Sequence, residues 1–282
     1  MPDTWTSLRE QQSPDAPVRL VLTAVEFDVL WDDLGLGPTP AVLRLASPGR
    51  TRAERREVQT AGLRALGERG LAGPTGAGPE LARLVRLLAR PVEQLELRGW
   101  WGRSVRAVAA RGQDAGVLAV RQDGTVTLTA CESLPSGLIG TLPPVPPGTS
   151  RSGTVPTGVL AGALATADVV TALTAENVPL PEARMLDRVL GATDRSAQVV
   201  ALGFDRWGGA RRVGGVLGIL DSRHGRHLMT RSVGPDGVEW TTVAPADTRG
   251  LRRRISELLE GAVDPPANRP EHGPATRRQG RP

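Results

Sequence analysis

The residue types that could carry nucleophilic or metal chemistry are few in this sequence. Cys131 is the single cysteine, which excludes an internal disulfide and a cysteine-based zinc site within the chain. It ends an apolar stretch, where a free thiol usually packs as a small hydrophobe. His224 and His227 stand beside arginines, whose charges disfavour a bound divalent cation, so we expect a solvated turn there. The sequence has no Gly-x-Ser-x-Gly nucleophile elbow.

Carboxylates and glycines predict no catalytic or phosphate site either. Asp32 and Asp33 are consecutive near the end of an expected helix, so their side chains point to different sides. A Walker loop needs a lysine, and all 35 basic residues of this chain are arginine. The glycines between 208 and 218 lack the dinucleotide-binding spacing and lie in a strand context. We therefore predict no enzyme activity, no cofactor and no metal, while an unrecognised hydrolase with perturbed titrating groups stays an open alternative.

The arginines gather in two expected helices. Arg50, Arg52, Arg55 and Arg56 form one cluster and 252–254 form another, and such clusters can contact phosphates. Glutamates alternate with them, which is typical of a solvated helix face. The formal net charge is only +5, and the high pI of about 11.0 follows from the absence of lysine and tyrosine. We predict no nucleic-acid partner, with an arginine-rich nucleic-acid-binding regulator as the alternative.

The 282 residues suffice for one large domain or two small ones. A strand at 18–22 precedes a capping box, Thr23 to Glu26, and a second box, Thr51 to Glu54, opens another helix. A further strand is expected at 41–45. A helix at 80–90 then gives way to period-two patterning, which predicts strands at 92–101, 104–110, 116–121 and 125–130 and a short helix at 133–142.

The second half of the chain repeats this order of elements. Helices are expected at 157–173 and 181–190, strands at 197–204, 210–220, 226–231 and 238–243, and a closing helix at 246–259. Asp123-Gly124 and Asp236-Gly237 are the hairpin turn pairs of the two halves. The repeat predicts an internal duplication with pseudo-two-fold symmetry and an α+β fold whose halves share one sheet.

The predicted organisation has five parts: a flexible leader (1–17), a first α+β half (18–142), a Pro/Gly connector (143–156), a second α+β half (157–262) and a disordered tail (263–282). The start of the chain is acidic and lacks an apolar stretch, so we expect no secretory signal. The longest weakly polar run, 158–170, contains Asp168 and is too short to span a membrane. We expect a soluble cytoplasmic protein without membrane insertion.

Five segments together resemble the EspG family of ESX (type VII) secretion-associated proteins of actinobacteria. They are LVLTAVEFDVLWDDLGLG from Leu20, TRAERREVQTAGLRALGERGL from Thr51, LVRLLARPVEQLELR around Pro91, the hairpin GVLAVRQDGTVTL, and EWTTVAPADTRGLRRRISELL near the end. The resemblance extends over roughly 18–261, and it is the order and spacing of the segments that make it specific. Arginine in place of lysine also indicates a GC-rich, actinobacterial genome.

This resemblance implies a quasi-two-fold α+β fold with a central, largely antiparallel sheet and helical bundles. It also implies a cytosolic chaperone without enzymatic activity, which keeps helical secretion substrates soluble for export. The expected partners are PE/PPE-like proteins or small helical-hairpin heterodimers. In the family the substrate is held by a loop between early strands and by a helical bundle. Here the resemblance assigns substrate binding to Arg98, Gly99, Trp100, Trp101, Gly102 and Arg103 in the loop and to Leu180, Arg184, Met185 and Arg188 in the bundle.

The two adjacent tryptophans of this loop can also be interpreted from the residues alone. Consecutive side chains at a strand end face opposite sides, so one of Trp100 and Trp101 can pack in the core while the other is exposed. An exposed tryptophan flanked by glycine and arginine has the composition of an interface hot spot. The alternative is that both tryptophans pack in the core.

Overall fold

The computed structural model describes residues 18–74, 76–205 and 208–263. The expected leader, 1–17, lies outside the described residues, as does the expected tail apart from Val263. The first half contains β1 (Arg19–Thr23), α1 (Ala24–Asp33), η1 (Ala41–Leu43), α2 (Arg52–Glu68), β2 (Ala72–Gly73), β3 (Gly76–Ala77), α3 (Pro79–Ala89), β4 (Glu93–Trp100), β5 (Ser104–Arg111), β6 (Gly116–Gln122), β7 (Thr125–Ala130) and α4 (Leu134–Ile139).

The second half follows the same plan. It contains β8 (Gly153–Pro156), α5 (Thr157–Leu164), α6 (Val169–Ala175), α7 (Leu180–Gly191), β9 (Thr193–Phe204), β10 (Ala210–Ser222), β11 (Gly225–Val233), β12 (Glu239–Pro245) and α8 (Thr248–Val263). Each half thus has a lone strand, helices, a four-stranded meander and a closing helix. This order is the duplication that the sequence predicts.

One antiparallel sheet of ten strands runs through the molecule in the order β1-β7-β6-β5-β4-β9-β10-β11-β12-β8. The halves meet where β4 pairs with β9, from Glu93 opposite Gly203 to Trp100 opposite Ser196. Strand order is therefore symmetric about this pair, with each half's lone strand, β1 or β8, at an outer edge. The predicted α+β class with a central, largely antiparallel sheet is confirmed.

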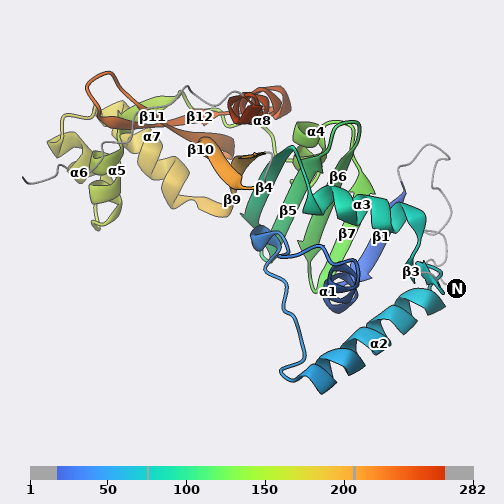
Figure 1. The fold of residues 1–282 in the computed structure, drawn as a ribbon. Helices are drawn as coiled ribbons and strands as arrows, with labels where there is room; N and C mark the ends of the chain where they lie inside the picture. The colour runs from blue at the N-terminus through green and yellow to red at the C-terminus, as the bar shows by residue number, and fades with distance from the viewer. Residues whose placement is uncertain (1–17, 75, 206–207, 264–282) are drawn as a thin grey trace, which may run out of the picture.

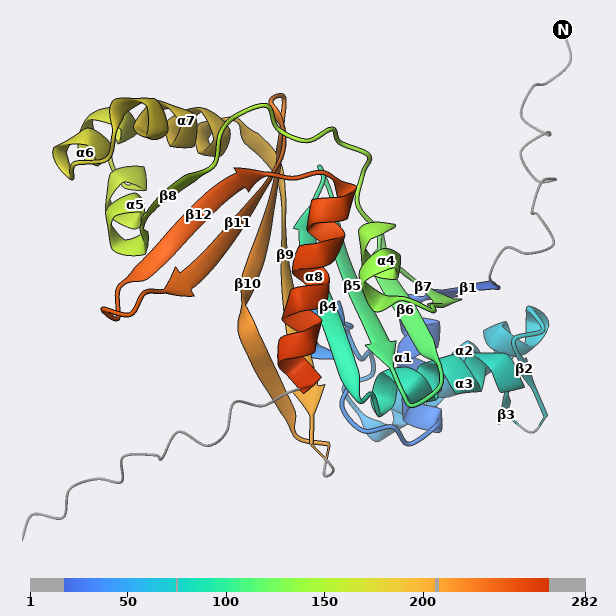
Figure 2. The ribbon, with the colours of Figure 1, turned by 90° about the horizontal axis from the view of Figure 1, so that it is seen from above.

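Helices cover both faces of the sheet (Figures 1 and 2). The closing helices α4 and α8 lie side by side on one face and share a core with β4, β5, β9 and β10, formed around Leu97, Val199 and Ile255. On the opposite face, α1, α3 and η1 bury a second core around Phe27 and Leu84. A third core belongs to α5, α6 and α7, packed on β8 and β12. No helix among the described residues is long and apolar enough to cross a membrane.

Local sequence signals explain most element boundaries. Both predicted capping boxes are present, with the hydroxyls of Thr23 and Thr51 accepting from the amides of Glu26 and Glu54. Each glutamate in turn accepts from the threonine amide, so two helix-terminal donors are satisfied at each start. The β6–β7 hairpin turns at Asp123 and Gly124, whose φ angles are 48° and 78°, as a tight two-residue turn requires.

Three expected elements differ in the structure. Residues 41–43 form a 3₁₀ turn instead of a strand, because Pro40 starts it and Arg44 ends it at a φ of 45°. The expected helix 157–173 is two helices, and Asp168 caps the second by accepting from the Thr171 amide. The second meander's turn is longer than the predicted two-residue hairpin, since β11 ends at Val233 and β12 begins at Glu239.

The outermost helix, α2, is attached to α1 by a close crossing and by an ion-pair network. Gly62 lies against Val29, so that a Cβ at position 62 would stand 3.0 Å from the valine side chain. Arg55 binds the nearly buried carboxylate of Asp28 at 2.5 Å and the exposed carboxylate of Asp32 at 2.9 Å. Arg55 therefore has a structural role, unlike its exposed neighbour Arg56.

This network predicts unequal effects for two adjacent arginines. Arg55→Ala should lower the free energy of unfolding by about 2 kcal/mol, because the Asp28 carboxylate would stay nearly buried without its charged donor. Arg56→Ala, at an exposed position, should change it by less than about 0.5 kcal/mol. Urea denaturation of both variants measures the difference. Equal losses would show that the Asp28 contact does not hold α2.

Candidate functional site

The potentially reactive side chains do not come together. Cys131 is half-buried beside the core under α4, where its Sγ donates to the carbonyl of Ser133, and burial raises the pKa of its thiol. A raised pKa opposes nucleophilic chemistry. Among the described residues no group of three His, Cys, Asp or Glu side chains could hold a metal ion.

His227 corrects one of the sequence interpretations. It is fully buried in β11 instead of lying in a solvated turn, because the connector folds over it. Ser150 contacts its Nε2 at 2.8 Å, and Gly148 packs so closely that a Cβ there would meet the imidazole ring. Burial lowers the pKa of His227. The neighbouring Arg226 forms a buried ion pair with Asp221 and also donates to the carbonyl of Pro143, which fixes the connector along β11.

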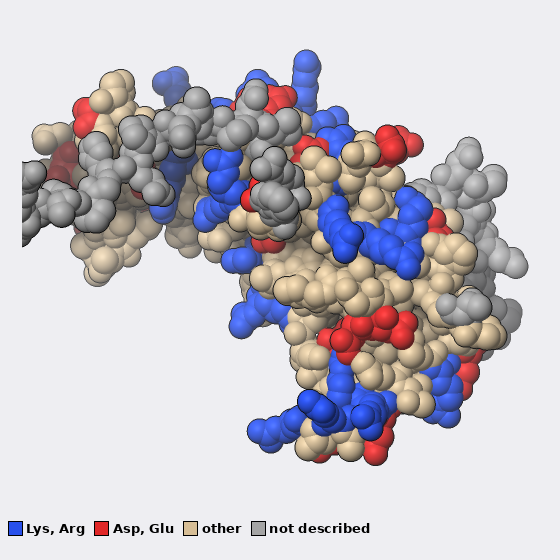
Figure 3. All heavy atoms as spheres, in the orientation of Figure 1, with Lys and Arg blue, Asp and Glu red and all other residues tan. Residues whose placement is uncertain are grey.

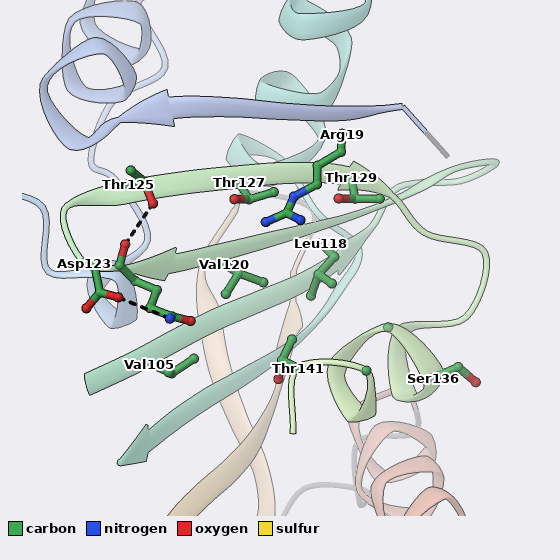
Figure 4. A pocket seen from close by; sticks show the side chains of 13 residues that line it. Arg19, Val105, Leu118, Val120, Asp123, Thr125, Thr127, Thr129, Ser136 and Thr141 are labelled. Carbon is green, nitrogen blue, oxygen red and sulfur yellow. Dashed lines mark hydrogen bonds between the residues drawn. The ribbon is translucent and has the colours of Figure 1, made fainter. Parts of the chain in front are cut away.

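A hollow of about 580 Å³ lies on the face of the first half that α4 covers only in part (Figure 4). Thr125, Thr127 and Thr129 of β7 line one side and Thr141 lies opposite, and the side chain of Arg19 lies between Thr127 and Thr129. Asp123, at the rim, accepts from the Gln122 amide and pairs with Arg103. The hollow thus presents hydroxyls and methyl groups without an acid and base pair that could act on a substrate.

The loop between β4 and β5 separates its two tryptophans as the strand pattern predicts. Trp100 is 54% exposed, whereas Trp101 is half-buried and packs against the core under α8 and α4. The Trp101 indole lies on Gly99, where a Cβ would approach its ring to 2.2 Å. Gly102 makes the turn at a φ of 73°. The backbone amide of Trp101 donates a hydrogen bond to the backbone carbonyl of Arg103 across it. Gly99 and Gly102 are therefore required by packing and by backbone conformation respectively.

Helix α7 shows two distinct faces. Ala183, Leu186 and Val189 are buried in the third core. The predicted contact residues Leu180, Arg184 and Arg188 are exposed and follow one another at helical spacing. Met185 is half-buried, and its Cε lies next to Gly153 of β8. Three of the four bundle residues therefore form an accessible stripe, and Met185 supports the helix from beneath.

The loop and α7 lie at the same end of the sheet. Trp100 is in register with Ser196, near the start of β9, and α7 ends at Gly191 just before that strand. The β4–β9 pairing thus places the β4–β5 loop near the C-terminal end of α7, the end that leads into β9. The sequence analysis assigned both segments to substrate binding, and that assignment stays a prediction.

A buried carboxylate near this end of the sheet was not found from the sequence. Glu96 lies two residues before Arg98 on the same face of β4 and is 7% exposed. Gln94 donates to it at 2.9 Å, while Arg98 is 3.7 Å away. Burial raises the pKa of Glu96 despite these neighbours. The alternation of β4 could have placed Glu96 beside Arg98, but its burial depends on η1, which was predicted as a strand.

The arginine clusters of α2 and α8 carry mixed charges. Blue and red surfaces adjoin over α2 in Figure 3. Arg64 pairs with Glu68 on α2, and both Arg253 and Arg254 pair with Glu257 on α8. These helix faces have the pattern of solvated surfaces.

The different environments of the two tryptophans predict different costs of removal. Trp101→Ala should lower the free energy of unfolding by about 3 kcal/mol, because it empties space over Gly99. Trp100→Ala should change it by less than about 0.5 kcal/mol, since the indole is largely in solvent. Thermal or urea denaturation measures both. A large loss for Trp100→Ala would mean that its indole packs in the core.

Glu96 predicts a pH-dependent stability. Burial raises the pKa of Glu96 in the folded state, so the folded chain holds this proton more tightly than the unfolded chain does. The free energy of unfolding therefore falls as the pH rises from the pKa of Glu96 in the unfolded chain toward its pKa in the folded chain. Glu96→Gln, which is neutral at every pH, should therefore be more stable than the wild type at about pH 7 and nearly equal to it at about pH 4. Urea denaturation at both values tests this. A constant difference would exclude ionisation as the cause.

Comparison with known proteins gives consistent results. No curated protein matches the chain. Among solved structures, a similar fold is found in the Mycobacterium tuberculosis type VII secretion system chaperone EspG5, described in complex with a PE25-PPE41 dimer. The TM-score is 0.70 at 15% sequence identity, over 87% of this chain and 97% of that chain. The EspG family model matches residues 23–257, which is most of the chain. The chain therefore belongs to the EspG family.

Proposed function

We propose that this protein is a cytoplasmic chaperone of type VII secretion that binds helical substrate proteins and has no enzymatic activity. Family membership supports the proposal, together with the similarity in fold to EspG5, which is described as a chaperone bound to a PE25-PPE41 dimer. The partners proposed here are a PE/PPE-like pair or a small helical-hairpin heterodimer. The partner would be held in a soluble form until export.

The observation that carries the proposal is the exposed Trp100 at the end of β4, on the side of the sheet where α7 leads into β9. An exposed indole on a rigid strand end loses little conformational freedom on binding, which is why tryptophan dominates many interfaces. Gly99 and Trp101 fix the strand end from the opposite face. Trp100 is therefore preorganised to contact a partner.

The proposed binding surface joins this loop, Arg98 to Arg103, to the stripe of Leu180, Arg184 and Arg188. Its composition is apolar side chains flanked by arginines, which suits the mixed surface of a helix end. Leu164, at the end of α5, and Leu180, at the start of α7, are both nearly half exposed, at 48% and 44%. Met185 would act indirectly, by holding α7 on β8.

Affinity capture from the organism that encodes the chain tests the proposal. The tagged wild type should retain a helical protein pair encoded beside a type VII locus, which mass spectrometry would identify. Trp100→Ala should bind the pair about thirtyfold more weakly and retain much less of it, because a buried interface tryptophan is worth about 2 kcal/mol or more. The same pair, once purified, gives the affinity by calorimetry.

Val92→Ala is the matched control for this experiment. Val92 directly precedes β4, at the strand end opposite Trp100, and is also 54% exposed. Its truncation should leave capture unchanged. Nucleic acid that elutes with salt, without a helical pair, would contradict the chaperone proposal and favour the arginine-rich regulator.

A further inference from the structure

Three arginines stand side by side across the sheet next to Trp100. Arg98 on β4 is in register with Arg106 on β5, and Arg106 is in register with Arg121 on β6. We call these three residues the arginine row. Like charges directly opposite one another on one face of a sheet are destabilising, so the row requires either internal compensation or a bound counter-charge.

A fourth arginine approaches the row from the chain after η1. Arg44 has a left-handed backbone with a φ of 45°, which is uncommon for a residue other than glycine. The pKa of Arg106 is lowered, chiefly by burial and also by the positive charges of Arg44, Arg98 and Arg121. All four cationic groups therefore interact across a small area. Uncommon backbone conformations of this kind concentrate at functional sites.

Compensation within the described part of the chain is incomplete. Arg106 donates to the carbonyl of Val42 at 3.2 Å, and Arg121 donates to those of Leu43 and Arg44 at 2.7 and 2.8 Å. These carbonyls end η1 and orient the guanidinium groups, but they carry only partial charge.

The nearby carboxylates compensate the row only at its Arg98 end. Glu96 is 3.7 Å from Arg98 and buried, while Asp123 is paired with Arg103 at 3.1 Å. Within residues 18–74, 76–205 and 208–263, no carboxylate pairs with Arg44, Arg106 or Arg121. A hollow of about 240 Å³ is lined by Arg106 and Arg121 and also by Asp123, whose carboxylate is paired with Arg103.

We infer that the arginine row is an anion-binding surface that receives acidic side chains of the helical partner. The inference rests on the proposed function and adds the partner's chemistry to it. Guanidinium groups bind carboxylates in a two-pronged geometry, which makes such contacts selective as well as attractive. Trp100 lies two residues beyond Arg98 on the same face of β4. One continuous surface would therefore contact both apolar and acidic side chains of the partner.

The spacing of the row indicates how a helix would lie on it. Neighbouring strands are about 4.8 Å apart, so the three arginines extend over about 10 Å across the strands. Seven residues of an α-helix rise about 10.5 Å. A helix that crosses the strands with carboxylates at i, i+4 and i+7 would therefore meet Arg98, Arg106 and Arg121 in turn.

Charge-selective binding of a model helix tests the inference. The probes are an alanine-based helical peptide with Glu at i, i+4 and i+7, the same peptide with Gln at those positions, and short single- and double-stranded DNA. Calorimetry would compare the wild-type chain with Arg98→Gln and Arg52→Gln at low and high salt. Arg98 is exposed and, unlike Arg106 and Arg121, makes no hydrogen bond to η1, while Arg52 is an exposed arginine on the distant α2.

The wild type should bind the Glu peptide about fivefold more tightly than the Gln peptide, and the preference should weaken at high salt. Arg98→Gln should lose most of this preference, whereas Arg52→Gln, with the same change in net charge, should keep it. Equal binding of the two peptides, or equal effects of the two variants, would overturn the inference. Tighter, Arg98-dependent binding of DNA would overturn it in favour of a nucleic-acid surface.

Failure of this inference can be distinguished from failure of the proposed function. If a helical pair is captured by the wild type but the Glu and Gln peptides bind alike, only the anion-binding role of the arginine row is wrong. If no helical pair is captured but the Glu peptide binds through Arg98, the row binds acidic helices and the chaperone proposal is wrong.

Discussion

The antiparallel pairing of β4 with β9 is the interaction on which the rest of the structure depends. It joins the two halves into one ten-stranded sheet and aligns Trp100 with Ser196. Through that register the β4–β5 loop and α7 reach the same end of the molecule. Helices α4 and α8 pack on β4 and β9 and share one hydrophobic core with them. A shift of one residue would reverse the faces of β4, exposing Trp101 and burying Trp100.

One face of β4 packs in the shared core, and the other face carries the exposed side chains of the proposed binding surface. Leu95, Leu97, Gly99 and Trp101 face the shared core, so the strand end is held from behind. Arg98 and Trp100 face the other way, beyond the cover of η1. Adjacent arginines with a single carboxylate partner, Glu96, and an exposed indole are unfavourable in an isolated chain. Their presence on a well-supported strand end is understandable if a partner covers them.

Much of the fold could be predicted from the sequence, because its signals are local. Capping boxes fixed the starts of α1 and α2, period-two patterning located the meanders, and repetition of the same order indicated two halves. The 3₁₀ turn at Ala41–Leu43 was missed since its apolar residues resemble a short strand. The environment of His227 was missed because the connector that buries it is distant in sequence. The tryptophan loop was assigned, but the arginine row was not, since its members come from three strands whose register only the folded sheet defines.

Hydrogen exchange of the chain with and without its purified helical partner tests the central claim most directly. The account predicts that binding slows exchange in the β4–β5 loop, at Arg98 to Ser104, and along α7. It predicts little change in α2 and α8, where Arg64, Arg253 and Arg254 pair with glutamates of their own helices. Protection confined to α2 or α8, with none at the loop, would contradict the assignment of the binding surface to the end of the sheet where β4 meets β9.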